Sequence, residues 1–126
     1  MMGLLSGLLG NASTVDKEAV ASELQQILAA GEEVDVAFKL IRDLIVFTDK
    51  RLLLVDKQGL TGKKIEYHSI PFKSISHFSI ETAGHFDLDA ELKIWISGAQ
   101  TPAIAKQFKK DKSIYDIQKV LVAVCT

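Results

Sequence analysis

The chain has 126 residues, of which 48% are hydrophobic and 25% are charged, and its formal net charge is −1. This length suits one globular domain with a substantial core, and the near-zero charge excludes a global basic field that would attract nucleic acid or anionic lipid. The single cysteine, Cys125, excludes an intrachain disulfide and fits a reducing cytoplasm, and no apolar run approaches the roughly 18 residues of a transmembrane helix.

Residues 1–14 are rich in leucine and glycine and lack the positive charges that begin a signal peptide. We expect a short helical turn whose leucines pack on the domain or on a neighbour. A membrane-touching anchor is the alternative. An interfacial helix normally carries Lys or Arg on its polar face, however, and this segment contains neither.

A helix is predicted from about Val15 to Ala30. Ser13 or Thr14 is expected to begin it, because Ser13 with Asp16 three residues later resembles a capping box. Gly31 is expected to end it as a C-terminal cap. The apolar face of this helix consists of Val20, Leu24, Ile27 and Leu28.

The longest alternating segment is 86–97, in which every even position is apolar and the odd positions are polar apart from Trp95. This pattern predicts one long strand with one face in a core. Shorter apolar runs between turn residues predict six further strands. A second helix is expected after them, with Ser113 as its cap and Asp116 in its first turn. The seven expected strands are 34–40, 44–48, 52–55, 64–69, 74–82, 86–97 and 103–108.

The order of these elements favours an antiparallel meander or barrel, because no strand–helix–strand alternation occurs. Alternation within the strands also predicts which side chains are largely buried. The expected core residues are Phe38, Leu40, Phe78, Ile80, Leu92, Ile94 and Ile96.

Four segments resemble the bacterial pleckstrin-homology-like family: 37–43, 47–52, 69–75, and 86–89 followed by Leu92. The resemblance implies an α+β, mainly β fold, in which seven antiparallel strands form two orthogonal sheets of a partly open barrel. It implies a capping C-terminal helix, with the helix at 15–30 as an addition. A single domain is then expected over 1–126, with the barrel and last helix in 33–126. It also implies homo-oligomeric rings of about five subunits.

The connection between the first two strands differs from that of phosphoinositide-binding relatives. There, basic residues cluster in and beside a substantial loop, because phosphate recognition needs several converging donors and cations. Here the connection is Arg42-Asp43, one cation beside one anion. Inositol-phosphate binding at the usual place is therefore not expected.

No catalytic set is evident in the sequence. Cys125 has no His nearby in sequence to act as its base, and a small, partly buried structural role is favoured. Histidines and carboxylates that flank one hairpin could in principle bind a metal. Their spacing is not that of a dense metal-binding motif, however, and carboxylates are expected on a strand face that points to solvent. We expect no cofactor and no metal; the ligands weighed are His77, His85, Asp87 and Asp89.

Two kinds of surface remain as binding candidates. The candidate sheet edges are 44–48 and 103–108, because unpaired groups on an edge favour pairing with another chain. Aromatic and apolar residues on these edges and on an outward face predict a subunit contact, for which the candidates are Leu44, Val46, Trp95, Ile104 and Phe108. For Trp95, cover by the N-terminal helix is the equal alternative. Lysines around the fourth strand predict an anionic-ligand patch of Lys57, Lys63, Lys64 and Lys73. A solvated rim is the favoured interpretation of these lysines, and of the second group, Lys106, Lys109, Lys110 and Lys112.

The sequence as a whole favours a non-enzymatic scaffold or binding module that self-associates into a ring. Its partner is a second copy of itself, and the ring would present a surface to another protein or ligand in the cytoplasm. A peripheral module for anionic lipid head groups is the first alternative, with only weak membrane contact. A small metal-dependent enzyme is the second. Nucleic acid is disfavoured, because aromatic residues are sparse among the lysines.

Overall fold

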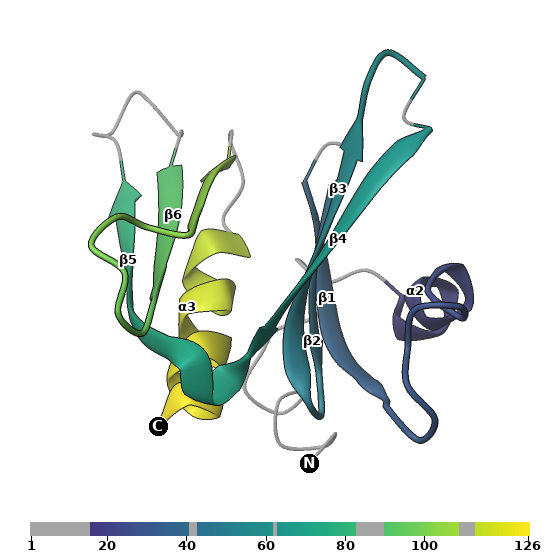
Figure 1. Cartoon of the computed structure of the whole chain (residues 1–126), viewed down its shortest axis with the longest axis horizontal. Helices are drawn as coiled ribbons and strands as arrows, with labels where there is room; N and C mark the ends of the chain where they lie inside the picture. Colours follow the sequence, from purple (N-terminus) through teal and green to yellow (C-terminus); the bar gives the residue numbers. More distant parts are fainter. Residues whose placement is uncertain (1–15, 41–42, 62, 83–89, 109–112) are drawn as a thin grey trace. The chain divides into compact units, whose positions relative to one another are not determined.

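The computed structural model describes residues 16–40, 43–61, 63–82, 90–108 and 113–126. The chain divides into two compact units, one ending at Pro71 and one beginning at Phe72. In order, the elements are α2 (Lys17–Glu23), β1 (Val34–Leu40), β2 (Asp43–Thr48), β3 (Arg51–Gln58), β4 (Lys64–Pro71), the 3-10 turn η1 (Phe72–Ser74), β5 (Ile75–Thr82), β6 (Ala90–Ile96), β7 (Ile104–Phe108) and α3 (Ser113–Cys125) (Figure 1).

The first unit is an antiparallel sheet in the order β1-β2-β3-β4, and α2 packs against β1. Apolar side chains at alternate positions of the strands meet the apolar side of the helix, which is what orients α2 on the sheet. Side chains on the other face of this sheet are buried as well. On that face the rings of Phe38 and Phe47 pack edge to face, with their centroids 6.2 Å apart. The cluster beneath α2 consists of Val20, Leu24, Val34, Ala37, Leu44, Val46, Leu53 and Val55.

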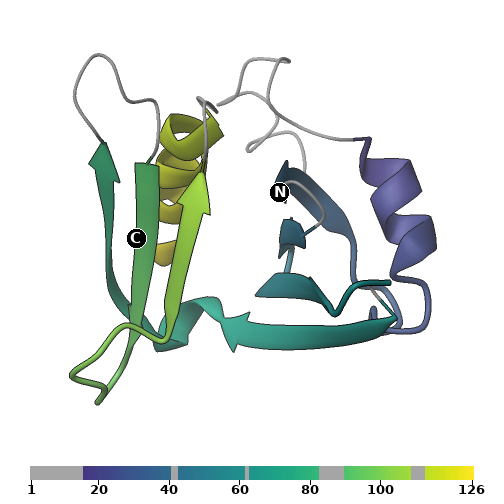
Figure 2. The same cartoon turned by 90° about the horizontal axis from the view of Figure 1, so that it is seen from above.

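The second unit is an antiparallel sheet in the order β5-β6-β7, with α3 against one face (Figure 2). Ala90, Leu92 and Ile94 of β6 are buried on the helix side. The register places Ile104 beside Ile94 and Phe108 beside Ala90. The side chains that α3 buries are Ile114, Ile117, Val120 and Leu121.

The expected fold class is confirmed: the protein is mainly β, with two antiparallel sheets, a helix before the first sheet and a helix after the second. β1 has the predicted bounds, and β3 extends three residues past its predicted end at Val55 to Gln58. Ala90–Ile96 of the long predicted strand forms β6, whereas residues 86–89 lie outside the described ranges.

The predicted N-terminal helix was too long. α2 ends at Glu23, and Gly31, with φ 79°, lies in the connection to β1 rather than at the helix end. Its N-cap is Asp16, whose Oδ1 accepts from the Glu18 N–H at 3.0 Å, so Asp16 does not occupy the predicted capping-box position. The proposed caps Ser13 and Thr14 lie outside the described residues. At the other end of the chain, Ser113 is the first residue of α3 rather than its cap.

The predicted core was partly wrong. Phe38, Leu92 and Ile94 are fully buried, as expected. The other four are only half-buried, because they lie at the end of a strand or on an edge strand: Leu40, Phe78, Ile80 and Ile96.

Candidate binding surface

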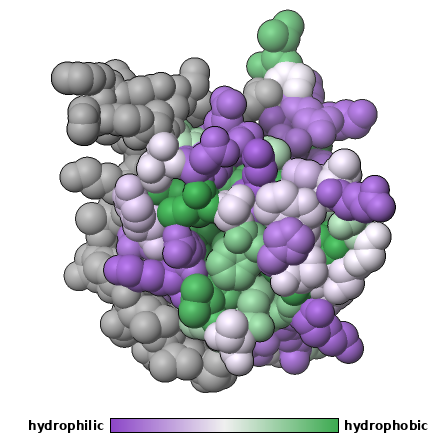
Figure 3. All heavy atoms as spheres, turned by 90° about the vertical axis from the view of Figure 1, so that its left-hand side faces the viewer, coloured by the Kyte–Doolittle hydropathy of each residue, from purple (hydrophilic) through white to green (hydrophobic). Residues whose placement is uncertain are grey.

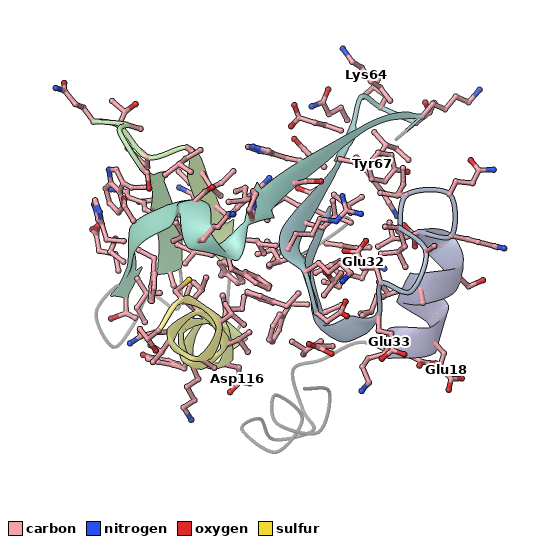
Figure 4. The ribbon with its side chains drawn as sticks, turned by 60° about the horizontal axis from the view of Figure 1, so that its bottom comes forward. Glu18, Glu32, Glu33, Lys64, Tyr67 and Asp116 are labelled. Carbon is pink, nitrogen blue, oxygen red and sulfur yellow. The ribbon has the colours of Figure 1, made fainter. Side chains whose placement is uncertain are left out.

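Glu32 is a buried acid that the sequence patterns did not single out. Its side chain is 1% exposed and forms a two-pronged ion pair with Arg51: Nε lies 2.9 Å from Oε2, and Nη2 donates to Oε1 at 2.9 Å. Thr48 donates its hydroxyl to Oε2 at 2.6 Å, and the Ala29 N–H donates to Oε1. Figure 4 shows Glu32 where the segment after α2 meets the strands.

The same network determines the ionisation of Glu32. Burial alone would raise the pKa of this carboxyl, but hydrogen bonds from Arg51, Thr48 and Ala29 outweigh it and lower the pKa from 4.5 to about 2. The carboxylate is therefore ionised and fully engaged within the protein. This arrangement is typical of a structural ion pair rather than of a general acid or base.

Arg51 also connects the buried ion pair to other parts of the first unit. Nη2 also donates to the Ile27 carbonyl at 2.9 Å, and Nη1 donates to the Ser69 hydroxyl on β4 at 2.6 Å. Two of the residues that resemble the family, Thr48 and Arg51, thus hold the connection between α2 and β1 on the β2–β3 turn. That motif therefore has a structural role here.

Asp35 is a second buried acid on β1, at an irregularity in the pairing with β2. Burial raises the pKa of this carboxyl, and the neighbouring charge of Asp49 raises it further. Its Oδ1 has no hydrogen-bond partner among the described residues. A buried carboxyl oxygen without a partner costs free energy, so Asp35 does not stabilise the sheet through this atom.

The lysines of the predicted anionic-ligand patch come from both units: Lys57, Lys63 and Lys64 from the first and Lys73 from the second. Lys57 forms an ion pair with Glu23 of α2 at 3.0 Å, so its charge is already compensated. Lys63 and Lys64 lie together, exposed, at the start of β4, whereas Lys73 is exposed in η1 of the second unit. In the second lysine group, Lys106 is half-buried on β7; Lys109, Lys110 and Lys112 lie outside the described residues.

Trp95 stacks on His77 on the solvent side of the three-stranded sheet. The ring centroids are 4.4 Å apart and the planes differ by 19°. The Ser76 hydroxyl contacts the His77 ring at 3.2 Å and donates to the Trp95 carbonyl at 3.3 Å, which holds the pair in place. Seen from the side on which β5 and β6 lie, weakly polar and apolar side chains gather between hydrophilic ones (Figure 3).

The rest of the predicted contact residues lie inside their own units. Leu44 and Val46 belong to the cluster beneath α2, so the burial of both is explained without a neighbouring subunit. The prediction that 44–48 is an edge was wrong, because β2 lies between β1 and β3. Ile104 and Phe108 are buried on the helix side of β7, which is an edge strand, as expected.

The described residues contain no group of three or more His, Cys, Asp or Glu placed to hold a metal ion. Of the ligands weighed from the sequence, His77 stacks on Trp95, and His85, Asp87 and Asp89 lie outside the described ranges. Cys125 is half-buried in α3, and burial raises the pKa of its thiol, which disfavours a nucleophilic thiolate. In the part of the chain that the structure describes, no helix is long and apolar enough to cross a membrane.

Comparison with known proteins agrees with this fold. A family model for the bacterial PH domain matches residues 3–125, so the chain belongs to the bacterial pleckstrin-homology domain family. It is similar to the uncharacterized protein YjqA of Bacillus subtilis (strain 168), at 73% identity over 98% of this chain and 99% of that protein. It is also similar to YozO of the same organism, at 32% identity over 86% of this chain and 91% of that protein.

Two crystal structures resemble the whole chain. One is a pleckstrin homology domain from Shewanella amazonensis SB2B, with 53% identity and a TM-score of 0.83 over 98% of this chain and 99% of that one. The other is a DUF1696 family protein with a pleckstrin-homology domain from Shewanella loihica PV-4. It has 49% identity and a TM-score of 0.77 over 94% of this chain and 100% of that one.

Proposed function

We propose that this protein is a non-catalytic binding module of the cytoplasm that self-associates into a closed ring and presents a surface of that ring to another protein or ligand. The expected ring has about five subunits, a number that comes from the family resemblance alone. Closure of repeated head-to-tail contacts accounts for a ring but does not fix its size. Family membership supports the module, and the single cysteine is compatible with a reducing compartment.

The proposal rests on two features of the three-stranded sheet: β7 is an edge strand, and Trp95 of β6 stacks on His77 of β5. Among the described strands, β7 is paired only with β6, and the open edge of a sheet favours addition of another chain. Trp95 and His77 lie on the outward face of the same sheet, and tryptophan is enriched at the centre of protein contacts. A contact between this surface and a different edge is heterologous and can close into a ring.

Light scattering of the untagged protein at high micromolar concentration tests the proposal, and the expected result is a mass of several chains. Ala105 is exposed on β7, so Ala105→Lys should lower that mass by placing a charge in the contact. The matched control is Val122→Lys, at a 46% exposed position on α3, which should leave the mass unchanged. A wild-type mass of one chain refutes self-association, and a folded Ala105→Lys variant with the wild-type mass refutes the β7 contact.

A further inference from the structure

Asp35 is an acidic residue that the fold buries almost completely. It is 3% exposed, and its Oδ1 has no hydrogen-bond partner among the described residues. It lies in β1 where the register with β2 shifts, between Val34 and Val36. A buried charge without a partner is costly, so folding alone gives no reason for an aspartate at this position.

The charged groups that act on Asp35 from the described parts of the chain are two acids and one base. Asp49 follows β2, Glu33 precedes β1, and Lys17 is the first residue of α2. Burial raises the pKa of the Asp35 carboxyl, the charge of Asp49 raises it further, Lys17 opposes this change, and Glu33 adds to it. The fold therefore favours the protonated form of Asp35 more than water does.

The start of β1 is held by the same Asp49 that acts on Asp35. Asp49 Oδ1 accepts the Glu33 N–H at 2.9 Å, and the Asp49 N–H donates to the Glu33 carbonyl at 3.0 Å. A negative charge on Asp35 is repelled by the carboxylate that takes part in these contacts. Ionisation of Asp35 therefore acts on the bonds that fix the beginning of the strand.

The start of β1 can separate without unfolding of the whole unit. β1 is an edge strand of the described sheet, so only its pairing with β2 has to break. α2 packs against β1 (Figure 1), and with seven residues it is too short to remain helical by itself. Separation of β1 would therefore release α2 as well and uncover part of the apolar cluster beneath it.

We propose that Asp35 is a proton-controlled switch at the junction of α2 and β1. The junction is closed while the carboxyl carries a proton, and ionisation shifts it toward a locally open form in which α2 and residues 34–36 separate from the sheet. Because the closed form raises the pKa, the junction is most stable below the ordinary value of 3.8. That stability is lost progressively as pH rises from there to the raised pKa of the closed form.

A proton suits this site better than a metal ion. The part of the chain that the structure describes contains no group of three or more His, Cys, Asp or Glu placed to hold a metal, and burial leaves Asp35 little access to a larger ligand. The other buried acid, Glu32, does not switch in this range, because Arg51 matches its charge and its pKa is about 2. The switch does not depend on self-association.

Hydrogen exchange, corrected for the intrinsic pH dependence of amide exchange, tests the switch. From about pH 4 to about pH 8, protection of the amides of 17–24 and 34–37 should fall by up to about tenfold per pH unit, the limit for one proton, before it levels off. Asp35→Asn has the shape of the protonated acid and should keep protection constant within about twofold. The matched control, Glu18→Gln, removes an exposed acid of α2 and should retain the wild-type dependence.

Two comparisons distinguish local opening from global unfolding. The amides of β6, in the second unit, should show no such fall. Asp49→Asn keeps an oxygen for the Glu33 N–H but removes the repelling charge, so the fall should become smaller and end at a lower pH. Wild-type protection that does not change with pH, an Asp35→Asn variant that keeps the dependence, or an equal fall in β6 would overturn the proposal.

A carbon NMR titration of the Asp35 carboxyl in the wild-type protein needs no variant at this position. Its midpoint should lie above 3.8 and should move down in Asp49→Asn. A midpoint at or below the ordinary value would show that the closed junction accepts the charge, and the proposal would then be wrong.

Discussion

Replacement of Glu32 by Gln is expected to be the most informative test of the buried ion pair. The substitution keeps the size of the side chain but removes the charge that Arg51 and Thr48 contact. The pKa of Glu32 falls from 4.5 to about 2 on folding, a shift that corresponds to about 3 kcal/mol of stability at neutral pH. We expect Glu32→Gln to cost about 2–4 kcal/mol, because the Arg51 side chain, only 21% exposed, would lose its counter-ion.

The pH dependence of this cost gives a second readout. Because folding lowers the pKa, the stabilisation is fully present above pH 4.5 and is lost as pH falls toward about 2. Urea unfolding of the wild type and of Glu32→Gln should therefore differ most near neutral pH and converge in acid. The control is Glu33→Gln, at the exposed neighbouring position, with an expected change within about 0.5 kcal/mol. A Glu32→Gln cost that equals the control, or that does not change with pH, would refute the role of the ion pair.

Three further predictions concern the second unit. Ile94→Ala should lower the free energy of unfolding by about 2–5 kcal/mol, because it empties space beneath α3; a cost under about 0.5 kcal/mol in urea unfolding would contradict the assigned face. Deletion of 113–126 should abolish cooperative unfolding by exposing the face that α3 covers, whereas one sharp calorimetric transition would show that the helix is an accessory. His77→Ala should shift the fluorescence emission of Trp95 to longer wavelength, because water would replace the stacked ring; an unchanged spectrum would argue against the stack in solution.

Strand positions were largely predictable, because period-two patterns are local. β1 has the bounds that its alternation indicates. The helix before β1 was predicted too long, because contacts between residues distant in the sequence influence the connection that follows α2. Arg51 donates to the Ile27 carbonyl from 24 positions along the chain. The Ala29 N–H donates to the Glu32 side chain, which Arg51 in turn holds in place. Propensity in a short window cannot contain that information.

The candidate sites were less predictable, because sequence gives the residue type but not its partner. Apolar residues at both parities of 44–48 indicate cover on both faces, but α2, rather than a second subunit, covers Leu44 and Val46. Likewise, the lysine pattern does not reveal that Glu23 compensates Lys57.

The middle strand β2 and the edge strand β4 of the first unit should differ in the substitutions they accept. Five successive residues of β2, Leu44 to Thr48, are buried, whereas most residues of β4 are exposed. A saturation library screened for folding should therefore show a continuous intolerant block in β2 and broad acceptance along β4 and the turn before it. New specificities can arise most readily in that permissive stretch, because a change there alters the surface without weakening the core.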